Sequence, residues 1–275
     1  RPEQGLLKMR KELGLYANLR PIKLFDELLG ASSIKPEILK GADILFFREL
    51  TGDIYFGEKG RKNNGDTAFD VAEYSRFEVQ RIGRKAFEAA RTRRKKLVSV
   101  DKANVLESSR LWREEIQKLA LEYPDVEVEY QFVDATAMIL IKDPKRFDVV
   151  VTANLFGDIL TDIAAAICGG IGLAASGNIN PEGKFPSMFE PVHGSAPDIA
   201  GKNLANPYSL ILSTALLLDW YAQKSGNHKY STAAQAIRDA AGVAIHTKEV
   251  SKDIGGNLGT KEAGEALVKK LLGLR

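Results

Sequence analysis

The segment NLFGDILTD at 154–162 carries two carboxylates whose spacing suits a metal ion. Asp158 and Asp162 are four positions apart, so they share one face of a helix. Two like charges in this arrangement repel each other and cost stability unless a cation or a basic group neutralises them. Carboxylate oxygens are ligands that Mg²⁺ and similar cations prefer. The spacing fits a divalent-metal site, and a pair of solvated surface acids is the alternative.

Lys102 and Asp134 each follow a segment that reads as a buried strand, LVSV at 97–100 and VEVEYQFV at 126–133. Proteins of the α/β class bind ligands at the carboxyl ends of their parallel strands. Both residues are therefore candidates for a site at that edge of a sheet. The alternative is ordinary solvation in a loop, which is the common role of an isolated lysine or aspartate.

Three arginines, Arg10, Arg20 and Arg48, lie in otherwise apolar contexts. A guanidinium group binds a carboxylate through two parallel hydrogen bonds, so the three suit an anionic substrate with more than one carboxylate. Internal salt bridges to some of the 36 acidic residues are the alternative. Arg48 ends the apolar run ILFFR, where a charge needs a partner. For Tyr55, the functional interpretation is a proton donor, and the alternative is an aromatic side chain within a strand.

The composition is that of an ordinary globular protein. Of 275 residues, 44% are hydrophobic and 27% are charged, with a net charge of +3, which disfavours disorder and a polyanion-binding surface. The basic run RTRRKK at 91–96 is predicted to end a helix rather than to bind nucleic acid, since no aromatic residues are interleaved with it. The single cysteine, Cys168, fits a reducing compartment such as the cytoplasm. No apolar run reaches the roughly 18 residues of a membrane span.

Strand and helix signals alternate along the chain, which predicts an α/β layered fold with some parallel pairing. A capping box at Ser75 and Glu78 predicts a helix from there to about Lys96. Further helices are expected at 111–123 and after Asn154. The expected strands are 45–50, 97–100, 126–133 and 147–152, and the glycine-rich stretch at 168–178 suggests a domain boundary near 165–175.

The loop at 190–207 is dense in turn-forming and polar residues, which suits the wrapping of a ligand. His193 within it is by default a hydrogen-bonded structural residue. The sequence contains no GxGxxG phosphate loop, and GGIG at 169–172 is too short and too apolar in context to count as one.

Taken together, five long motifs resemble those of the isocitrate/isopropylmalate family of β-decarboxylating dehydrogenases, and most closely its isopropylmalate branch. The motifs are RPEQGLLKMRKELGLYANLRP, RELTGDIYFGE, VDKANVL, NLFGDILTD and FEPVHGSAPDIAGKNLANP. The resemblance implies a two-domain layered α/β fold with a mixed sheet. Residues 16–167 would form the dimerisation and metal/substrate domain, and residues 1–15 with 168–275 the cofactor-side domain. Chains of the family begin earlier, so the resemblance implies that the N-terminal part of the cofactor-side domain would be absent from this sequence.

The resemblance implies the NAD-dependent oxidative decarboxylation of 3-isopropylmalate to 4-methyl-2-oxopentanoate, a step of leucine biosynthesis. NAD and Mg²⁺ or Mn²⁺ would be the cofactors, and the protein would be a cytoplasmic homodimer with shared active sites that binds neither nucleic acid nor membranes. The alternatives are a related enzyme acting on tartrate, homoisocitrate or isocitrate, and a truncated remnant without catalytic activity.

The family's residue roles carry over onto matching positions of this sequence. Lys102 would accept the proton of the substrate hydroxyl and Tyr55 would deliver a proton to the product, with Lys102 and Asp134 acting from the neighbouring subunit. The metal ligands would be Asp134, Asp158 and Asp162. The substrate would contact Leu6, Arg10, Arg20, Arg48 and Asp158, with Glu3 beside Leu6. The cofactor would contact Glu190, His193, Gly194, Ser195, Ala196, Asp198, Ile199 and Asn206.

Overall fold

The computed structural model describes residues 2–30, 32 and 34–273, except for the side chains of residues 2 and 3. The chain falls into two compact units. Unit 1 consists of Arg1–Arg20, Asp43–Ile163 and Asn178–Met188, and unit 2 of Pro21–Ala42, Ala164–Gly177 and Phe189–Arg275. Among the described residues, no helix has the length and apolar character needed to cross a membrane.

Parallel strands form the centre of unit 1. Their order is β6-β5-β7-β2, with bounds Glu127–Phe132, Lys96–Asp101, Val149–Thr152 and Asp43–Glu49. In the parallel registers Arg48 lies opposite Thr152, and Asp101 lies opposite Phe132. The carboxyl ends of these strands therefore meet at one edge of the sheet, where Lys102 and Asp134 follow directly.

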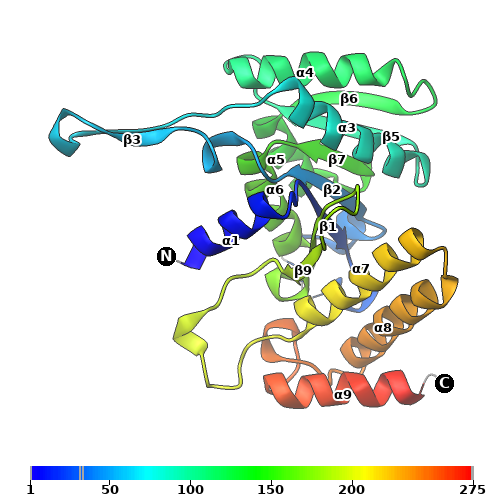
Figure 1. Cartoon of the computed structure of the whole chain (residues 1–275). Helices are drawn as coiled ribbons and strands as arrows, with labels where there is room; N and C mark the ends of the chain where they lie inside the picture. The colour runs from blue at the N-terminus through cyan, green and yellow to red at the C-terminus, as the bar shows by residue number, and fades with distance from the viewer. Residues whose placement is uncertain (1, 31, 33, 274–275) are drawn as a thin grey trace. The chain divides into compact units, whose positions relative to one another are not determined.

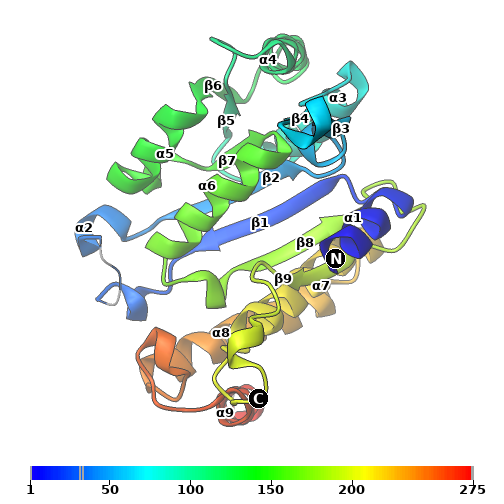
Figure 2. The same cartoon turned by 90° about the vertical axis from the view of Figure 1, so that its left-hand side faces the viewer.

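Three helices connect these strands along the chain, and a fourth follows the last of them. Figure 2 shows α3 and α4 on one side of the strands and α5 and α6 on the other. Their bounds are Arg76–Arg91, Glu107–Ala120, Val133–Lys142 and Asn154–Ile167. Large side chains that are almost fully buried fill the space between helices and strands, among them Phe46, Phe87, Trp112 and Phe147.

Helix α3 begins as the sequence predicts, because the capping box of Ser75 and Glu78 is formed in both directions. The helix ends at Arg91, however, and the prediction that it reaches Lys96 is wrong. Asp148, which is fully buried, accepts hydrogen bonds from the Arg94 backbone N–H and the Arg93 side chain. A buried carboxylate needs such partners, so the basic run turns toward it instead of continuing the helix.

The remaining elements of unit 1 are short. They are α1 (Pro2–Glu12), the 3₁₀ helices η2 (Asp53–Tyr55), η3 (Asn63–Gly65) and η4 (Pro144–Arg146), and the antiparallel hairpin of β3 (Lys59–Lys62) with β4 (Thr67–Asp70). The hairpin extends away from the other strands of the unit (Figure 1). Strand β1 (Ala17–Lys23) lies next to β2, and its Asn18 donates a hydrogen bond to Asn178 of β8 (Ala175–Ile179).

Unit 2 is mainly helical. Its three long helices, α7 (Tyr208–Ser225), α8 (His228–His246) and α9 (Thr260–Gly273), pack in sequence order. Strand β8 is the neighbour of β9 (Met188–Pro191) in the sheet, and the loop of predicted cofactor residues follows β9. The other elements are α2 (Pro36–Leu39) and the 3₁₀ helices η1 (Asp26–Leu28), η5 (Ile171–Leu173), η6 (Pro197–Ile199) and η7 (Lys252–Ile254).

The predicted α/β layered fold is confirmed. Each of the four predicted strands overlaps an observed one, whereas α1, α5 and the β3–β4 hairpin are absent from the sequence-based expectation. The assignment of a dimerisation domain and a cofactor-side domain to particular residues stays a prediction.

Candidate active site

Asp158 is the centre of a polar cluster at the carboxyl edge of the sheet in unit 1. Its Oδ1 accepts hydrogen bonds from Arg48 at 2.5 Å and from Arg20 at 3.3 Å, and its Oδ2 accepts one from the Tyr55 hydroxyl at 2.8 Å. The Arg48 guanidinium also lies 5.5 Å from the centre of the Tyr55 ring. Residues that the sequence predicts as substrate-binding and catalytic are therefore in direct contact.

Arg20 extends the cluster along α6 from Asp158 to Asp162. It donates a hydrogen bond to Thr161 and lies 3.6 Å from Asp162, so it bridges the two carboxylates that the sequence places one helical turn apart. Arg10, in the last turn of α1, is close enough for its charge to lower the pKa of both Arg20 and Arg48. The structure thus brings all three predicted arginines together around Asp158 and Asp162.

The charged side chains of this cluster shift one another's pKa values. Burial alone would raise the pKa of Asp158, but the positive charges of Arg48 and Arg20 outweigh it and hold that pKa below its usual value. For Asp162, burial dominates and raises the pKa, with the negative charge of Asp158 adding to the rise against the opposing charge of Arg20. Burial, together with repulsion from Arg20, lowers the pKa of Arg48 to about 10, which still leaves it charged at neutral pH.

Lys102 and Asp134 form a second group, at the ends of the neighbouring strands β5 and β6. The Lys102 Nζ donates to Asp134 Oδ1 at 2.6 Å, and the hydrogen bond lowers the pKa of the carboxyl group. The Asp134 side chain is 63% exposed, so the pair is open to a ligand or to another chain. Asp101, which is buried, accepts hydrogen bonds from Arg113 and the Ala103 backbone and fixes the loop that carries Lys102.

The predicted metal ligands therefore fall into two groups. Asp158 and Asp162 belong to the arginine cluster, and Asp134 belongs to the pair with Lys102. Across residues 2–30, 32 and 34–273, no three histidine, cysteine or acidic side chains are grouped so that they could hold a metal ion.

Two residues of the cluster were missed by sequence reasoning. Asn154, almost fully buried, accepts a hydrogen bond from Arg48 Nε and donates one to the Gly52 carbonyl, so it holds Arg48 against the first turn of α6. Thr161 accepts from Arg20. Their position within NLFGDILTD is the only signal that could have indicated them: Thr161 lies three residues after Asp158, on the same face of the helix.

Gly157 allows α6 to approach Arg48 closely. A Cβ atom at this position would lie 2.9 Å from Arg48 Cβ and 2.7 Å from Arg48 Cγ. We expect Gly157→Ala to displace Arg48 or the helix, to lower the free energy of unfolding by about 1–3 kcal/mol and to raise the substrate KM several-fold. Urea denaturation and steady-state kinetics measure both effects. The control is Gly264→Ala in α9, where the new methyl group meets open space; equal behaviour of the two variants would contradict the expectation.

The predicted cofactor residues lie on one segment of unit 2, from β9 to the start of α7. Gly194, Ser195, Ala196 and Asp198 are exposed, and Ala196 adopts a left-handed conformation with φ +42° just before η6. Asn206 has a structural role as well, because its side chain accepts a hydrogen bond from the Tyr208 backbone and donates one to Asp253. His193, half-buried, has its Nδ1 3.0 Å from the Gly194 carbonyl.

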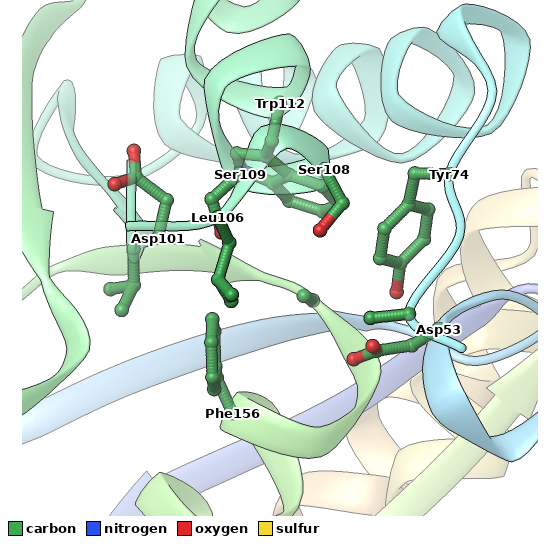
Figure 3. A pocket seen from close by; sticks show the side chains of 11 residues that line it. Asp53, Tyr74, Asp101, Leu106, Ser108, Ser109, Trp112 and Phe156 are labelled. Atoms are coloured by element: carbon green, nitrogen blue, oxygen red, sulfur yellow. The ribbon is translucent and has the colours of Figure 1, made fainter. Parts of the chain in front are cut away.

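Leu6 is half-buried on α1, four residues before Arg10, and the Glu3 side chain is outside the described part of the chain. A small cavity of about 20 Å³ lies beside Asp101, at the end of β5. Leu106 and Phe156 point toward each other across it, with Ser108, Tyr74 and Asp53 alongside (Figure 3). Its volume suits a single water molecule rather than a dicarboxylate, so the arginine cluster is the better candidate for substrate binding.

The parallel sheet with a carboxylate and arginine cluster at its carboxyl edge is the arrangement expected of an α/β enzyme that binds an anionic substrate. Comparison with known proteins identifies the family. The model of the isocitrate/isopropylmalate dehydrogenase family matches residues 1–267, so the chain belongs to that family.

Among similar proteins, a 3-isopropylmalate dehydrogenase of Rhodopirellula baltica is 52% identical, over 98% of this chain and 76% of the relative. A 3-isopropylmalate dehydrogenase of Hahella chejuensis is 48% identical, over 98% of this chain and 75% of the relative. Among solved structures, an isocitrate dehydrogenase from Methylococcus capsulatus is 37% identical with a TM-score of 0.86, over 96% of this chain and 76% of that chain.

Proposed function

We propose that this protein is an NAD- and divalent-metal-dependent dehydrogenase that converts 3-isopropylmalate to 4-methyl-2-oxopentanoate in leucine biosynthesis. The relatives that carry this name support the proposal. The observation that carries it is the convergence of Arg20 and Arg48 on Asp158, with the charge of Arg10 close to both arginines. A cytoplasmic homodimer is part of the same proposal.

The charge of the cluster suits a dicarboxylate. Three arginines and two aspartates leave one net positive charge, and a divalent cation would raise it to three, which an incoming substrate with two carboxylates largely neutralises. Arg48 is only 2% exposed, so it is already desolvated and its orientation is fixed by Asn154 and Asp158. Guanidinium groups fixed in this way bind carboxylates with little loss of conformational freedom.

The donors present fit a divalent cation. Asp162 has one long ion pair with Arg20, and its side chain is 53% exposed, so its oxygens retain lone pairs for a metal. Asp158 and Asp162 lie on one face of α6, and Asp134 would complete the set from the partner subunit. When bound, Mg²⁺ or Mn²⁺ supplies positive charge that stabilises negative charge developing on the substrate oxygen.

A second copy of the chain would bring the Lys102–Asp134 pair to the arginine cluster, as the family resemblance implies. The pair is suited to that role because it lies at the end of a strand with an exposed carboxylate. A two-fold symmetric dimer would form two such composite sites.

In the proposed reaction, NAD would supply the redox chemistry when bound, by accepting the hydride from C2 of the substrate. Lys102 accepts the proton of the 2-hydroxyl group, and the resulting β-keto acid loses the carboxylate on C3 as CO₂. Tyr55 then delivers a proton to C3. Burial and its hydrogen bond to Asp158 raise the pKa of Tyr55, so the hydroxyl keeps its proton until it is needed.

Asp198 is proposed to set the preference for NAD. Its carboxylate would accept hydrogen bonds from the adenosine ribose and repel the additional phosphate of NADP. We expect Asp198→Asn to raise the ratio of kcat/KM for NADP to that for NAD by about 10-fold, because removing one close repulsion changes binding by roughly 1–2 kcal/mol. The matched control is Asp239→Asn on the exposed surface of α8. An unchanged ratio in Asp198→Asn would exclude this role.

Leu6 is proposed to contact the isopropyl group of the substrate. An apolar wall favours a branched alkyl group over the third carboxylate of isocitrate.

The experiment that tests the proposed function compares turnover of 3-isopropylmalate, isocitrate, homoisocitrate and tartrate by the purified protein, with Mg²⁺ or Mn²⁺ and with EDTA. We expect NAD reduction with 3-isopropylmalate that EDTA abolishes. Preference for another substrate would overturn the assignment of Leu6, and absence of turnover with all four would favour the non-catalytic remnant.

A further inference from the structure

Asp53 is a buried residue that the proposed reaction does not use. Its side chain is among the buried polar groups at 6% exposure, and its backbone φ is +68°. Residues other than glycine adopt this left-handed conformation infrequently, and it persists where the surroundings hold it in place. Asp53 therefore occupies a position that its contacts must stabilise.

Those contacts join three segments of unit 1. The Asp53 carboxylate accepts a hydrogen bond from the Leu155 backbone N–H at 3.0 Å and one from the Ile54 N–H at 2.9 Å. The Asp53 N–H donates to the Glu73 carbonyl at 3.0 Å, and its own carbonyl accepts from Phe56 and Gly57. Asp53 thus ties the 3₁₀ helix η2 to the segment before α3 and to the first turn of α6.

The bond to Leu155 resembles a helix cap supplied from a distant part of the sequence. The first N–H groups of a helix have no partner within it, and a carboxylate there also interacts favourably with the helix dipole. Leu155 is the second residue of α6. The Asp53 carboxylate therefore fixes the start of the helix that carries Asp158 and Asp162.

The same residue fixes Tyr55 from the other side, because η2 consists of Asp53, Ile54 and Tyr55. The Tyr55 hydroxyl donates to Asp158 Oδ2 at 2.8 Å. We propose that Asp53 is a positioning residue, whose carboxylate holds η2 and the first turn of α6 at the separation that this hydrogen bond requires. This inference rests on the proposed function, because it takes Tyr55 to be the proton donor of that reaction.

A second hydrogen bond joins the same segments, which makes the proposal testable in a folded protein. The Asn154 side chain donates to the Gly52 carbonyl at 3.1 Å. Loss of the Asp53 carboxylate should therefore loosen the junction between η2 and the first turn of α6 without separating these two segments. A shift of about 1 Å in a reacting group can reduce a rate by roughly 100-fold.

Two variants of Asp53 distinguish the effect of losing its carboxylate from the effect of disturbing its backbone conformation. Asp53→Gly removes the carboxylate and keeps a residue that adopts positive φ freely, whereas Asp53→Asn keeps the shape and one oxygen acceptor. Lys248→Gly is the matched control, because Lys248 has φ +56° and is exposed in unit 2. We expect kcat with 3-isopropylmalate to fall by about 10–100-fold in Asp53→Gly, by several-fold in Asp53→Asn, and to stay unchanged in Lys248→Gly.

Two readouts distinguish positioning from a general loss of folded protein. With substrate deuterated at C2, the kinetic isotope effect should decrease in Asp53→Gly, because the later proton delivery by Tyr55 becomes slower than hydride transfer. A smaller fraction of folded enzyme would leave that isotope effect unchanged. In the Tyr55→Phe background, Asp53→Gly should cause a several-fold smaller loss than in the wild type. A folded Asp53→Gly variant with wild-type kcat, or losses that simply multiply, would overturn the proposal.

Amide hydrogen exchange tests the junction without reference to the reaction. We expect the amides of residues 154–158 to exchange at least about 10-fold faster in Asp53→Gly than in wild type or Lys248→Gly, because the Leu155 N–H loses its partner. Equal exchange in all three proteins would overturn the positioning role. Failure of the proposed function would appear differently, as a wild-type protein that does not turn over 3-isopropylmalate while the difference in exchange remains.

Discussion

Replacing Lys102 with alanine should lower kcat/KM for 3-isopropylmalate by about 10³-fold or more, with the NAD KM and the stability nearly unchanged. The effect is large because the lysine is proposed to accept the hydroxyl proton, and general bases contribute roughly 10²–10⁴-fold to a rate. The stability should change little because the Lys102–Asp134 ion pair is partly exposed, and such pairs contribute little to folding. Steady-state kinetics and thermal unfolding measure the two quantities.

A surface lysine provides the control for Lys102. Lys85 on α3 forms an exposed ion pair with Glu88 at 3.0 Å, and Lys85→Ala should keep wild-type kinetics. If Lys102→Ala also kept wild-type kinetics, the proton acceptor of the reaction would have to be another group.

Replacing Asp158 with asparagine should have the second large effect, a loss of about 10³-fold in kcat/KM together with weaker Mn²⁺ binding. Asparagine preserves the size of the side chain and removes the charge that faces both Arg48 and Arg20. The positive charges of Arg48 and Arg20 would then be less fully neutralised. A neutral amide is also a poorer ligand for a divalent cation than a carboxylate. Kinetics and a Mn²⁺ titration by calorimetry measure the two losses.

The Asp239→Asn variant again serves as the control, since it removes one exposed carboxylate from α8. It should retain both activity and Mn²⁺ affinity. Full Mn²⁺ affinity in Asp158→Asn would show that this carboxylate is not a metal ligand, whatever happens to the rate.

Local sequence signals predicted those parts of the fold that depend on neighbouring residues. The capping box of Ser75 and Glu78 placed the start of α3 correctly because its two hydrogen bonds join residues three positions apart. The end of α3 at Arg91 depends instead on Asp148, more than fifty residues later, so a helix to Lys96 was a reasonable but wrong expectation. Helix α5 was missed because its sequence VDATAMILIK has no side-chain cap and contains β-branched residues typical of strands.

In the candidate active site, too, a local sequence pattern predicts some features and distant contacts determine the others. The spacing of Asp158 and Asp162 on one helix face was visible in the sequence, and the structure confirms that both lie on α6. The convergence of Arg20, Arg48 and Tyr55 on Asp158 involves residues separated by more than one hundred positions, so no local pattern could predict it. Only the family resemblance of whole motifs indicated that these residues belong to one site.

The sharing of one active site between two subunits can be tested with a heterodimer in which one protomer carries Lys102→Ala and the other carries Asp158→Asn. The two variants are produced together with different affinity tags, and the mixed dimer is isolated by sequential purification. If Lys102 serves the Asp158 cluster of its partner, one of the two sites in each mixed dimer contains both native residues. We expect the mixed dimer to show about half of the wild-type activity per dimer, while each variant alone is nearly inactive. A mixed dimer as inactive as its parents would contradict an active site shared between subunits.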